Sequence, residues 1–433
     1  MKKYLLPLTL TLLLLVTAAI AAMQTDRLSR LTRALEEVGL QALNQSAEEM
    51  QSLTLDLEKL LISGQPAQQA ALLHRISLTA GDVQQCLANL PLSHEAMAGT
   101  LTFVGELRDD AAAMLPALTS QALTASQLER LSACQASCSQ LSSQLSLARQ
   151  AMEAGGMTLM QHQNVFSADA SVSQRPLEQL GSAEDGVIYP PVEVHLPAAP
   201  RGLPEGDVTR EEARQLARDF VGAEQAIAIT DAPDASGVLP AYGVTVQTPD
   251  VQLNMEITRQ GGKVLWMMPE TASFPMTQSP SACESAALTF LKERDFGQAE
   301  AVHRQLYDGL CVISFAPVQE DVLLYPDLLT VQVRMDTLQV VGLEARSYWT
   351  NHVRRALPEP ALSADEAAAL LSSQAEVQEH RLCLIPEERR EALCWQFTVT
   401  RGGETYLIYL DAQDGREVAI RKVIPLENGS TAA

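Results

Sequence analysis

"TREE" at residues 209–212, "SACE" at residues 281–284 and "SADE" at residues 363–366 share one pattern: a hydroxyl residue, two spacers and a glutamate. In a capping box the hydroxyl accepts a hydrogen bond from the third helical amide, and the glutamate accepts one from the amide of the hydroxyl residue. An alanine- or leucine-rich run follows each stretch, and the stretches start 72 and 82 residues apart. The chain is therefore expected to begin a helix in the same way three times.

Each predicted helix is followed by apolar runs of period two, the pattern of a strand with one buried face. In the first copy Val251, Leu253, Met255 and Ile257 alternate with polar residues. The predicted strand pairs, each joined by a turn, are 251–258 with "KVLWMM" at 263–268, "LTVQVR" at 329–334 with "QVVGLEA" at 339–345, and "ETYLIYL" at 404–410 with "REVAIRKV" at 416–423. The chain thus repeats a helix-plus-antiparallel-sheet module, expected at 207–272, 278–350 and 360–425.

Residues 26–156 show no strand alternation and are expected to form an antiparallel helical bundle. Breakers and amino caps divide this region into about four helices, with Gly64, Pro66, Pro91 and 116–120 as breakers and Ser93 and Thr124 as caps. The second half of this region also holds "TASQ" at 124–127, a capping box in its glutamine form. A proline-rich linker at 157–206 separates the bundle from the modules.

The last predicted helix of the bundle carries a continuous apolar stripe with steps of three or four residues: Leu128, Leu131, Cys134, Cys138, Leu141, Leu145, Ala148 and Met152. Such a stripe is typical of a bundle or coiled-coil seam. One interpretation is a bundle that buries its own stripes, and this is favoured. The other is a stripe kept partly open for a partner helix.

The amino terminus, "MKKYLLPLTLTLLLLVTAAIAAM", has two lysines before an uncharged apolar run. A run of about 22 residues is long enough to cross a bilayer. Residues 1–25 are therefore expected to form a retained membrane anchor, with a cleaved signal peptide as the alternative because Ala19, Ile20 and Ala21 fit a cleavage site. Either segment places the bulk of the chain outside the cytoplasm.

The composition narrows the possible partners. The 433 residues carry a net charge of −22, which repels nucleic-acid phosphates and argues against a nucleic-acid partner. The seven cysteines cannot all pair within one chain. Cys134 and Cys138 have a spacing that suits a metal, but they lie on the apolar stripe without a nearby histidine, so buried thiols are expected. Cys383 and Cys394 flank a predicted hairpin turn and could form a disulfide across it.

No motif for catalysis or cofactor binding occurs in the chain, which lacks HExxH, GxSxG, GxGxxG and Walker A stretches. The seven histidines are scattered. We therefore expect no catalytic residues, no cofactor, no metal and no small-molecule substrate. Tyr348 and Trp349 are the candidate interaction residues, because aromatic side chains anchor interfaces, although they fill small cores equally well.

The order of anchor, helical domain and three modules resembles the YpeB family of germination proteins from spore-forming Firmicutes, whose modules are PepSY domains. The resemblance also rests on "LPLSHEAMAGTLTFVGEL" at 90–107 and "EEARQLARDFVG" at 211–222. Members usually have a Tyr-Asp-Gly-Pro-Phe-Ser stretch in the linker, where this chain reads "YPPV" at 189–192, so it looks like a divergent member. The fold class expected is α plus α+β: a membrane helix, an antiparallel helical bundle, and three PepSY-like modules in tandem.

The resemblance implies a non-catalytic protein of the spore inner membrane that faces the cortex. Proteins of this family are needed for the stable presence of SleB, a cortex-lytic peptidoglycan hydrolase, and PepSY modules are associated with restraint of a partner hydrolase. We therefore expect an extracytoplasmic germination protein that binds and stabilises, localises or restrains a SleB-like hydrolase. The alternative is a membrane-anchored sensor or scaffold of the cell envelope that acts through its bundle.

Overall fold

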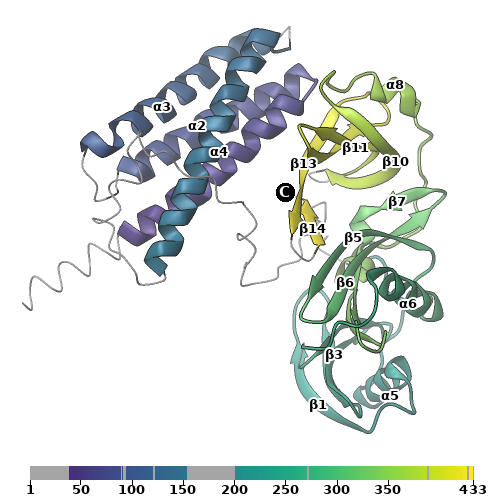
Figure 1. Cartoon of the computed structure of the whole chain (residues 1–433). Coiled ribbons are helices and arrows are strands. Elements are labelled where there is room, and N and C mark those ends of the chain that lie inside the picture. The colour runs from purple at the N-terminus through teal and green to yellow at the C-terminus, as the bar shows by residue number, and fades with distance from the viewer. Residues whose placement is uncertain are drawn as a thin grey trace, which may run out of the picture. The chain divides into compact units, whose positions relative to one another are not determined.

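The computed structural model describes residues 39–153 and 200–432, apart from 89, 91–93, 120–121, 271–272, 388–389 and 427–428. The chain divides into two compact units, Met1–Arg175 and Pro176–Ala433. Figure 1 shows a helical first unit and a second unit rich in strands. The predicted anchor at 1–25 lies outside the described residues, and none of the helices within them is long and apolar enough to span a membrane.

The first unit is a helical bundle, as predicted. Its helices cover 39–62, Pro66–Ala88 (α2), His94–Met114 (α3) and Ala125–Glu153 (α4), with a short 3-10 turn at Leu115–Thr119 (η1). Of the predicted breaks, Gly64 lies between the first helix and α2, Pro66 is the first residue of α2, and 116–119 fall in η1, whereas Pro91 and Ser120 lie outside the described residues. The capping box that opens α4 is confirmed, because the Thr124 amide donates to Gln127 Oε1 at 2.9 Å and the Gln127 amide donates to Thr124 Oγ1 at 3.4 Å. Ser93, the other predicted cap, lies outside the described residues.

The apolar stripe of α4 faces the bundle core. Leu131, Cys138 and Leu145 are 1% exposed or less, and Leu128 and Cys134 pack against the same cluster partly buried. The side chain of Met152 lies outside the described residues. The bundle therefore buries the described part of this stripe against its own helices, as the favoured interpretation requires.

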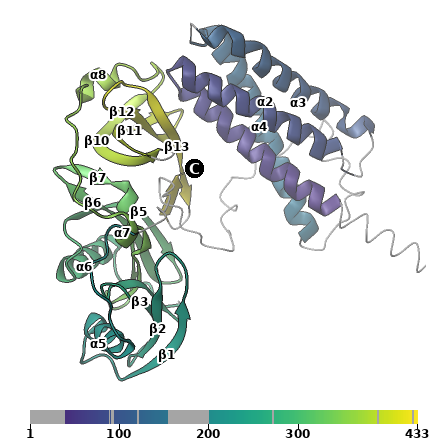
Figure 2. The ribbon, with the colours of Figure 1, turned by 180° about the vertical axis from the view of Figure 1, so that it is seen from behind.

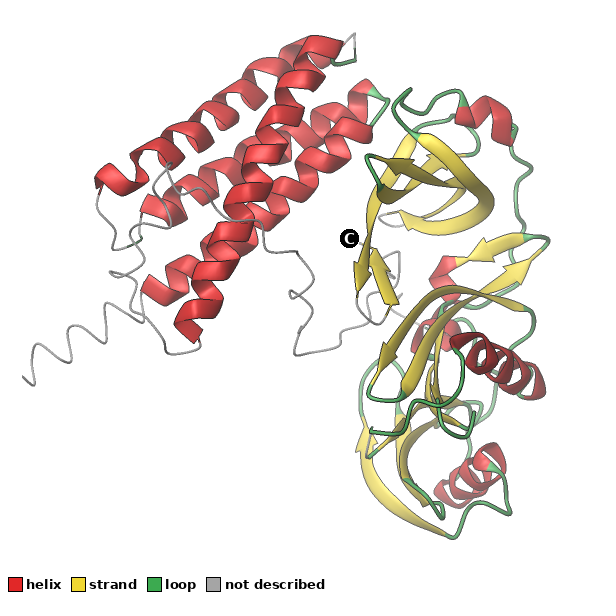
Figure 3. Ribbon diagram, in the orientation of Figure 1, coloured by secondary structure: helices red, strands yellow, loops and turns green. Residues whose placement is uncertain are grey.

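The second unit contains three groups of strands, each preceded by a helix (Figure 3). The first group follows α5 (Arg210–Val221) and comprises β1 (Ala228–Ala235), β2 (Ala241–Gln247), β3 (Gln252–Thr258) and β4 (Val264–Pro269). The second follows α6 (Pro280–Glu293) and comprises β5 (Ala299–Tyr307), β6 (Leu310–Gln319), β7 (Val322–Leu324), β8 (Leu329–Arg334) and β9 (Val340–Glu344). The third follows α8 (Ala364–Ala368) and comprises β10 (Glu376–Glu387), β11 (Arg390–Arg401), β12 (Glu404–Asp411), β13 (Glu417–Leu426) and β14 (Gly429–Ala432).

In the described part of the chain these strands form one sheet in the order β1-β2-β3-β4-β9-β8-β6-β5-β14-β13-β12-β11-β10-β7. The neighbours pair antiparallel, except that β7 pairs parallel with β10 through Leu323 and Leu324. The predicted strand pairs of all three groups are present. The predicted alternation is confirmed in β3, where Leu253, Met255 and Ile257 are at most 1% exposed.

The first two groups share one hydrophobic core. It runs from Ala213 in α5 through Met267 in β4 to Leu343 in β9, because β4 and β9 pair directly. The helices α5 and α6 lie on the same face of this sheet in Figures 1 and 2. Two further clusters, around Tyr409 and Leu393, combine residues of the third group with residues of the second, such as Leu323 and Leu324 in β7.

Of the three capping boxes predicted in the modules, two are correct and one is wrong. Thr209 and Ser363 each form a complete box with the glutamate three residues on. At α6, however, the amino cap is Ser279, whose hydroxyl accepts from the Ala282 amide at 3.2 Å, and not Ser281. The reason is Pro280, which lacks an amide hydrogen and has a φ suited to the first helical position, so the cap falls one residue before it.

The position of the α6 amino cap, at Ser279 and not at Ser281, can be tested with two matched substitutions on one helix. Ser279→Ala is expected to lower the free energy of unfolding by about 1 kcal/mol, the usual cost of an amino cap. Ser281→Ala is expected to change it by less than about 0.5 kcal/mol, because its hydroxyl caps no helical amide. Urea unfolding of the two variants measures the difference, and equal losses would contradict the assignment of the cap to Ser279.

Candidate functional site

The two predicted interaction residues lie in α7 (Arg346–Asn351), directly after β9. Their side chains are buried, with Tyr348 4% and Trp349 9% exposed. The Trp349 Nε1 donates to the Val264 carbonyl at 2.9 Å, and the Tyr348 hydroxyl donates to the Phe296 carbonyl at 3.4 Å. Both rings also contact the Phe296 ring, at centroid distances of 5.6 and 5.2 Å. In this structure they fill the core that the first two strand groups share.

The chain that leaves α7 forms a polar cluster. The His352 ring stacks on Tyr348 at a centroid distance of 4.2 Å and an interplanar angle of 14°. Its Nδ1 lies 2.7 Å from a carboxylate oxygen of Asp327, a residue of the short 3-10 turn η3 (Tyr325–Asp327). The Asp327 side chain is completely buried.

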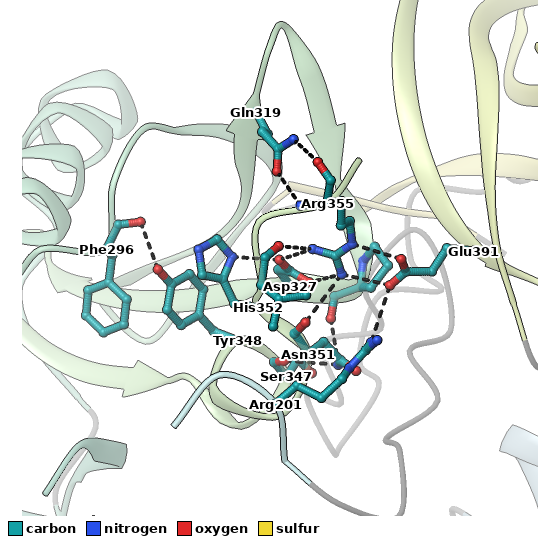
Figure 4. Close-up of polar contacts among 12 residues, drawn as sticks. Arg201, Phe296, Gln319, Asp327, Ser347, Tyr348, Asn351, His352, Arg355 and Glu391 are labelled. Carbon is teal, nitrogen blue, oxygen red and sulfur yellow. Dashed lines mark hydrogen bonds and ion pairs between the residues drawn. The ribbon is translucent and has the colours of Figure 1, made fainter. Parts of the chain in front are cut away.

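Arg355 is the centre of this cluster (Figure 4). Its guanidinium, 7% exposed, donates two hydrogen bonds to Asp327 at 2.7 and 2.8 Å and two to Glu391 at 2.7 and 2.8 Å. Asp327 belongs to the second strand group and Glu391 to β11 of the third. One guanidinium therefore holds two strand groups together with four charged hydrogen bonds, the strongest class of such bonds in proteins.

The segment before α5 joins the same cluster. The Arg201 amide donates to the Thr350 carbonyl at 2.9 Å, and its side chain lies 3.7 Å from Glu391. The Gly202 amide donates to the Trp349 carbonyl at 3.0 Å. A Cβ at Gly202 would lie 2.8 Å from that carbonyl oxygen, so the close approach requires glycine.

The electrostatics of the cluster favour a fixed contact between the second and third strand groups, here called the Arg355 joint. Burial lowers the pKa of Arg355, but the hydrogen bonds to Glu391 and Asp327 outweigh burial and raise the pKa above its usual value. Burial, with the Asp327 charge, raises the pKa of Tyr348 to about 12, so this phenol stays neutral. Because buried charges are costly unless each has a partner, removal of Arg355 would leave the buried Asp327 carboxylate without its guanidinium partner.

The described contacts of the cluster match only part of a hydrolytic site. A histidine with a buried aspartate makes two parts of a catalytic triad, but among the described residues neither a hydroxyl nor a thiol hydrogen-bonds to His352. The described residues also contain no group of three or more metal-ligating side chains close enough to share an ion. The arrangement can position two strand groups, and its described contacts supply no nucleophile.

The cysteines are thiols in this structure. Cys383 and Cys394 lie directly opposite each other in β10 and β11, as the hairpin interpretation required, and burial raises the pKa of both. Burial raises the pKa of Cys138 to about 12 and also raises that of Cys134. Such thiols are poor metal ligands and poor nucleophiles.

Sequence reasoning missed Arg355, Asp327 and Glu391. Arg355 is 28 residues from Asp327 and 36 residues from Glu391, so no local motif contains the three. The only signal near them was the connector after Tyr348 and Trp349, which carries His352, Arg354 and Arg355 within four residues.

Three family models match the chain. "YpeB N-terminal" matches residues 28–161, "YpeB sporulation, PepSY1 and PepSY2 domains" matches 178–358, and "Peptidase propeptide and YPEB domain" matches 361–421. The first covers the described bundle. The other two cover the three strand groups as far as residue 421 in β13, and the joint around Arg355 lies where they meet.

Curated relatives agree with these matches. The chain is 34% identical over 224 residues to "Sporulation protein YpeB" of Halalkalibacterium halodurans, covering 51% of this chain and 50% of that protein. It is 29% identical over 222 residues to the protein of the same name from Bacillus subtilis, covering 50% and 49%. The matched stretches thus span about half the length of these relatives. A solved structure, the "Bacillus megaterium YpeB C-terminal domain", has 27% identity and a TM-score of 0.46 over 51% of this chain and 99% of that one.

Proposed function

Because the chain belongs to the YpeB family of sporulation proteins, we propose that it acts in spore germination by binding a peptidoglycan hydrolase of the spore cortex. In this proposal the protein is held at the spore inner membrane by residues 1–25, with the bundle and three PepSY modules facing the cortex. Binding stabilises, localises or restrains a SleB-like hydrolase. The observation that carries the proposal is the match of bundle and strand groups, in this order, to the parts of that family.

The side-chain chemistry supports a binding role. The polar cluster around Arg355 is saturated with internal hydrogen bonds, and the buried thiols have raised pKa values. These groups stabilise the fold and leave no reactive side chain among them. A protein of this kind acts through its surfaces.

Strand addition at an open sheet edge is one route to a partner, because it satisfies both backbones. In the described sheet β1 has a strand neighbour on one side only. This strand contains Pro233 and a bulge between Ala232 and Ala235, and its carboxylates at Asp231 and Asp234 pair with Arg214 and Arg210 at 2.6 Å. Proline, bulges and charges are the features that discourage edge pairing, so another surface of the modules is the better candidate.

An open stripe on α4 would favour the alternative function, a sensor or scaffold that works through the bundle. The described part of that stripe is buried within the bundle. This favours the binding role of the second unit.

The test uses the purified full-length chain and the purified cortex hydrolase of the same organism. We expect a 1:1 complex in size-exclusion chromatography and isothermal titration calorimetry. The chain alone is expected to release no fragments from labelled spore peptidoglycan. Release of fragments by the chain alone, with no complex formed, would end the proposal.

A further inference from the structure

A groove of about 550 Å³ lies between α5 and α6, above the line where β4 pairs with β9. Figure 1 shows the two helices side by side on one face of the sheet. The groove therefore has a sheet as its floor, α6 along one side and the end of α5, with Phe220 and Val221, at the other. Its volume is within the range of specific ligand sites in proteins.

The wall formed by α6 is lined with small side chains: Ala282, Ser285, Ala286 and Thr289. These residues recur at steps of one helical turn, so they share one face of the helix. Ser285 and Thr289 are exposed, and Ala282 and Ala286 are partly buried. The wall leaves room for the side chains of an incoming segment.

The floor and the far side of the groove are apolar. Leu253 and Met267 come from β3 and β4, Val340 comes from β9, and Val221 comes from the end of α5. Leu253 and Met267 are each 1% exposed and belong to the shared core, so the floor is rigid. An apolar segment laid in the groove would instead cover Val221 and Val340, which are partly exposed, and remove their apolar surface from water.

Leu338, at the turn between β8 and β9, lines the groove in a strained conformation. Its φ is +63°, the left-handed region that normally takes glycine. A bulky residue kept in this conformation costs stability. Glycine at this turn would relieve the strain but would remove the apolar wall that Leu338 gives the groove.

A cation lies at one end of the groove. The guanidinium of Arg294 is 3.8 Å from the Phe290 ring centroid and 5.0 Å from that of Phe220. It donates to the Phe220 carbonyl at 2.7 and 3.2 Å, and its ion pair with Glu293 is long, at 3.6 Å. Burial lowers the pKa of Arg294, whereas that of Arg355 is raised by its hydrogen-bonded carboxylates. Among the described residues no carboxylate hydrogen-bonds to Arg294, so a carboxylate from outside the chain can make a closer pair than Glu293, which also lines the groove.

We propose that this groove receives an extended segment of the partner hydrolase, with small apolar side chains over the floor and a carboxylate at Arg294. The proposal rests on the function proposed above and names the site of that contact. The small side chains of α6 admit the backbone of the segment. Burial of apolar surface in the groove supplies the affinity. The carboxylate at Arg294 fixes the direction in which the segment lies.

The experiment compares two tryptophan substitutions, in the full-length chain titrated with the purified cortex hydrolase. Ser285→Trp fills the groove, whereas Gln215→Trp adds the same side chain at an exposed position of α5 that does not line it. We expect Ser285→Trp to weaken binding at least about tenfold and Gln215→Trp to leave it unchanged. Thr289→Trp repeats the test at a second exposed groove position, and thermal unfolding verifies that each variant is folded.

Charge is tested separately with Arg294→Gln. We expect weaker binding and a smaller loss of affinity as salt concentration rises, since a screened ion pair has been removed. If Arg294 only holds the ends of α5 and α6 together, Arg294→Gln would change the thermal stability and leave the salt dependence of binding as in the wild type.

The outcomes separate the two proposals. Wild-type affinity in both Ser285→Trp and Thr289→Trp would overturn the groove and leave the proposed function standing. Absence of binding by the wild type would overturn the proposed function, and the groove assignment with it.

Discussion

Arg355→Ala is expected to lower the free energy of unfolding of the second unit by about 3–5 kcal/mol, the cost of breaking a buried ion pair from one side. The substitution leaves the completely buried Asp327 side chain with the contact to the His352 ring, and it removes both hydrogen bonds to Glu391. All three tryptophans of the chain lie in the second unit, so their fluorescence during urea unfolding reports on that unit.

The neighbouring Arg354 provides the matched control. It pairs with Glu320 at 3.2 Å, but its side chain is 85% exposed. Arg354→Ala is therefore expected to change the free energy of unfolding by no more than about 0.5 kcal/mol, as for other surface ion pairs. If the two variants lost the same stability, Arg355 would not be the joint between the second and third strand groups.

Gly309→Ala has the second largest expected effect. Gly309 lies in the turn between β5 and β6 with φ of +78°, and a Cβ there would lie 1.8 Å from the Phe274 carbonyl oxygen. The Phe274 amide donates to the Asp308 carbonyl at 2.8 Å, which holds the two backbones together. We expect a loss of about 3 kcal/mol, from about 1–2 kcal/mol for left-handed alanine and about 1–3 kcal/mol for displaced backbone.

Gly402→Ala separates these two contributions. Gly402 has φ of +60°, but a Cβ there would have no neighbour within 4 Å. It is expected to lose only the conformational part, about 1–2 kcal/mol. Urea unfolding of both variants measures the difference, and an equal loss would show that the approach of Phe274 to Gly309 is not close.

Much of the fold could be predicted from local pattern. Alternation at Leu253, Met255 and Ile257 identified a strand with one buried face, and the boxes at Thr209 and Ser363 identified two helix starts. These features depend on residues within one element, where period and capping chemistry are visible in the sequence. The error at Ser281 was avoidable, because Pro280 already indicated a cap at Ser279.

The contacts between strand groups could not be predicted in this way. β4 and β9 pair through Trp266 with Glu344 and Met267 with Leu343, residues about 77 positions apart along the chain. The Arg355 joint and the groove at Arg294 also combine residues from distant elements. Their partners are chosen by the packing of complete sheets, which leaves no spacing or motif in the sequence.

The central claim, that the second unit acts by contact with a cortex hydrolase, is tested most directly by amine-reactive crosslinking in dormant spores of the organism that makes this protein. Lys292 is exposed on α6 beside the groove and provides an attachment point. Mass spectrometry is expected to find crosslinks from the second unit, including Lys292, to a peptidoglycan hydrolase. Detection of the hydrolase in the same sample, with crosslinks from this unit only to itself or to other classes of protein, would contradict the account.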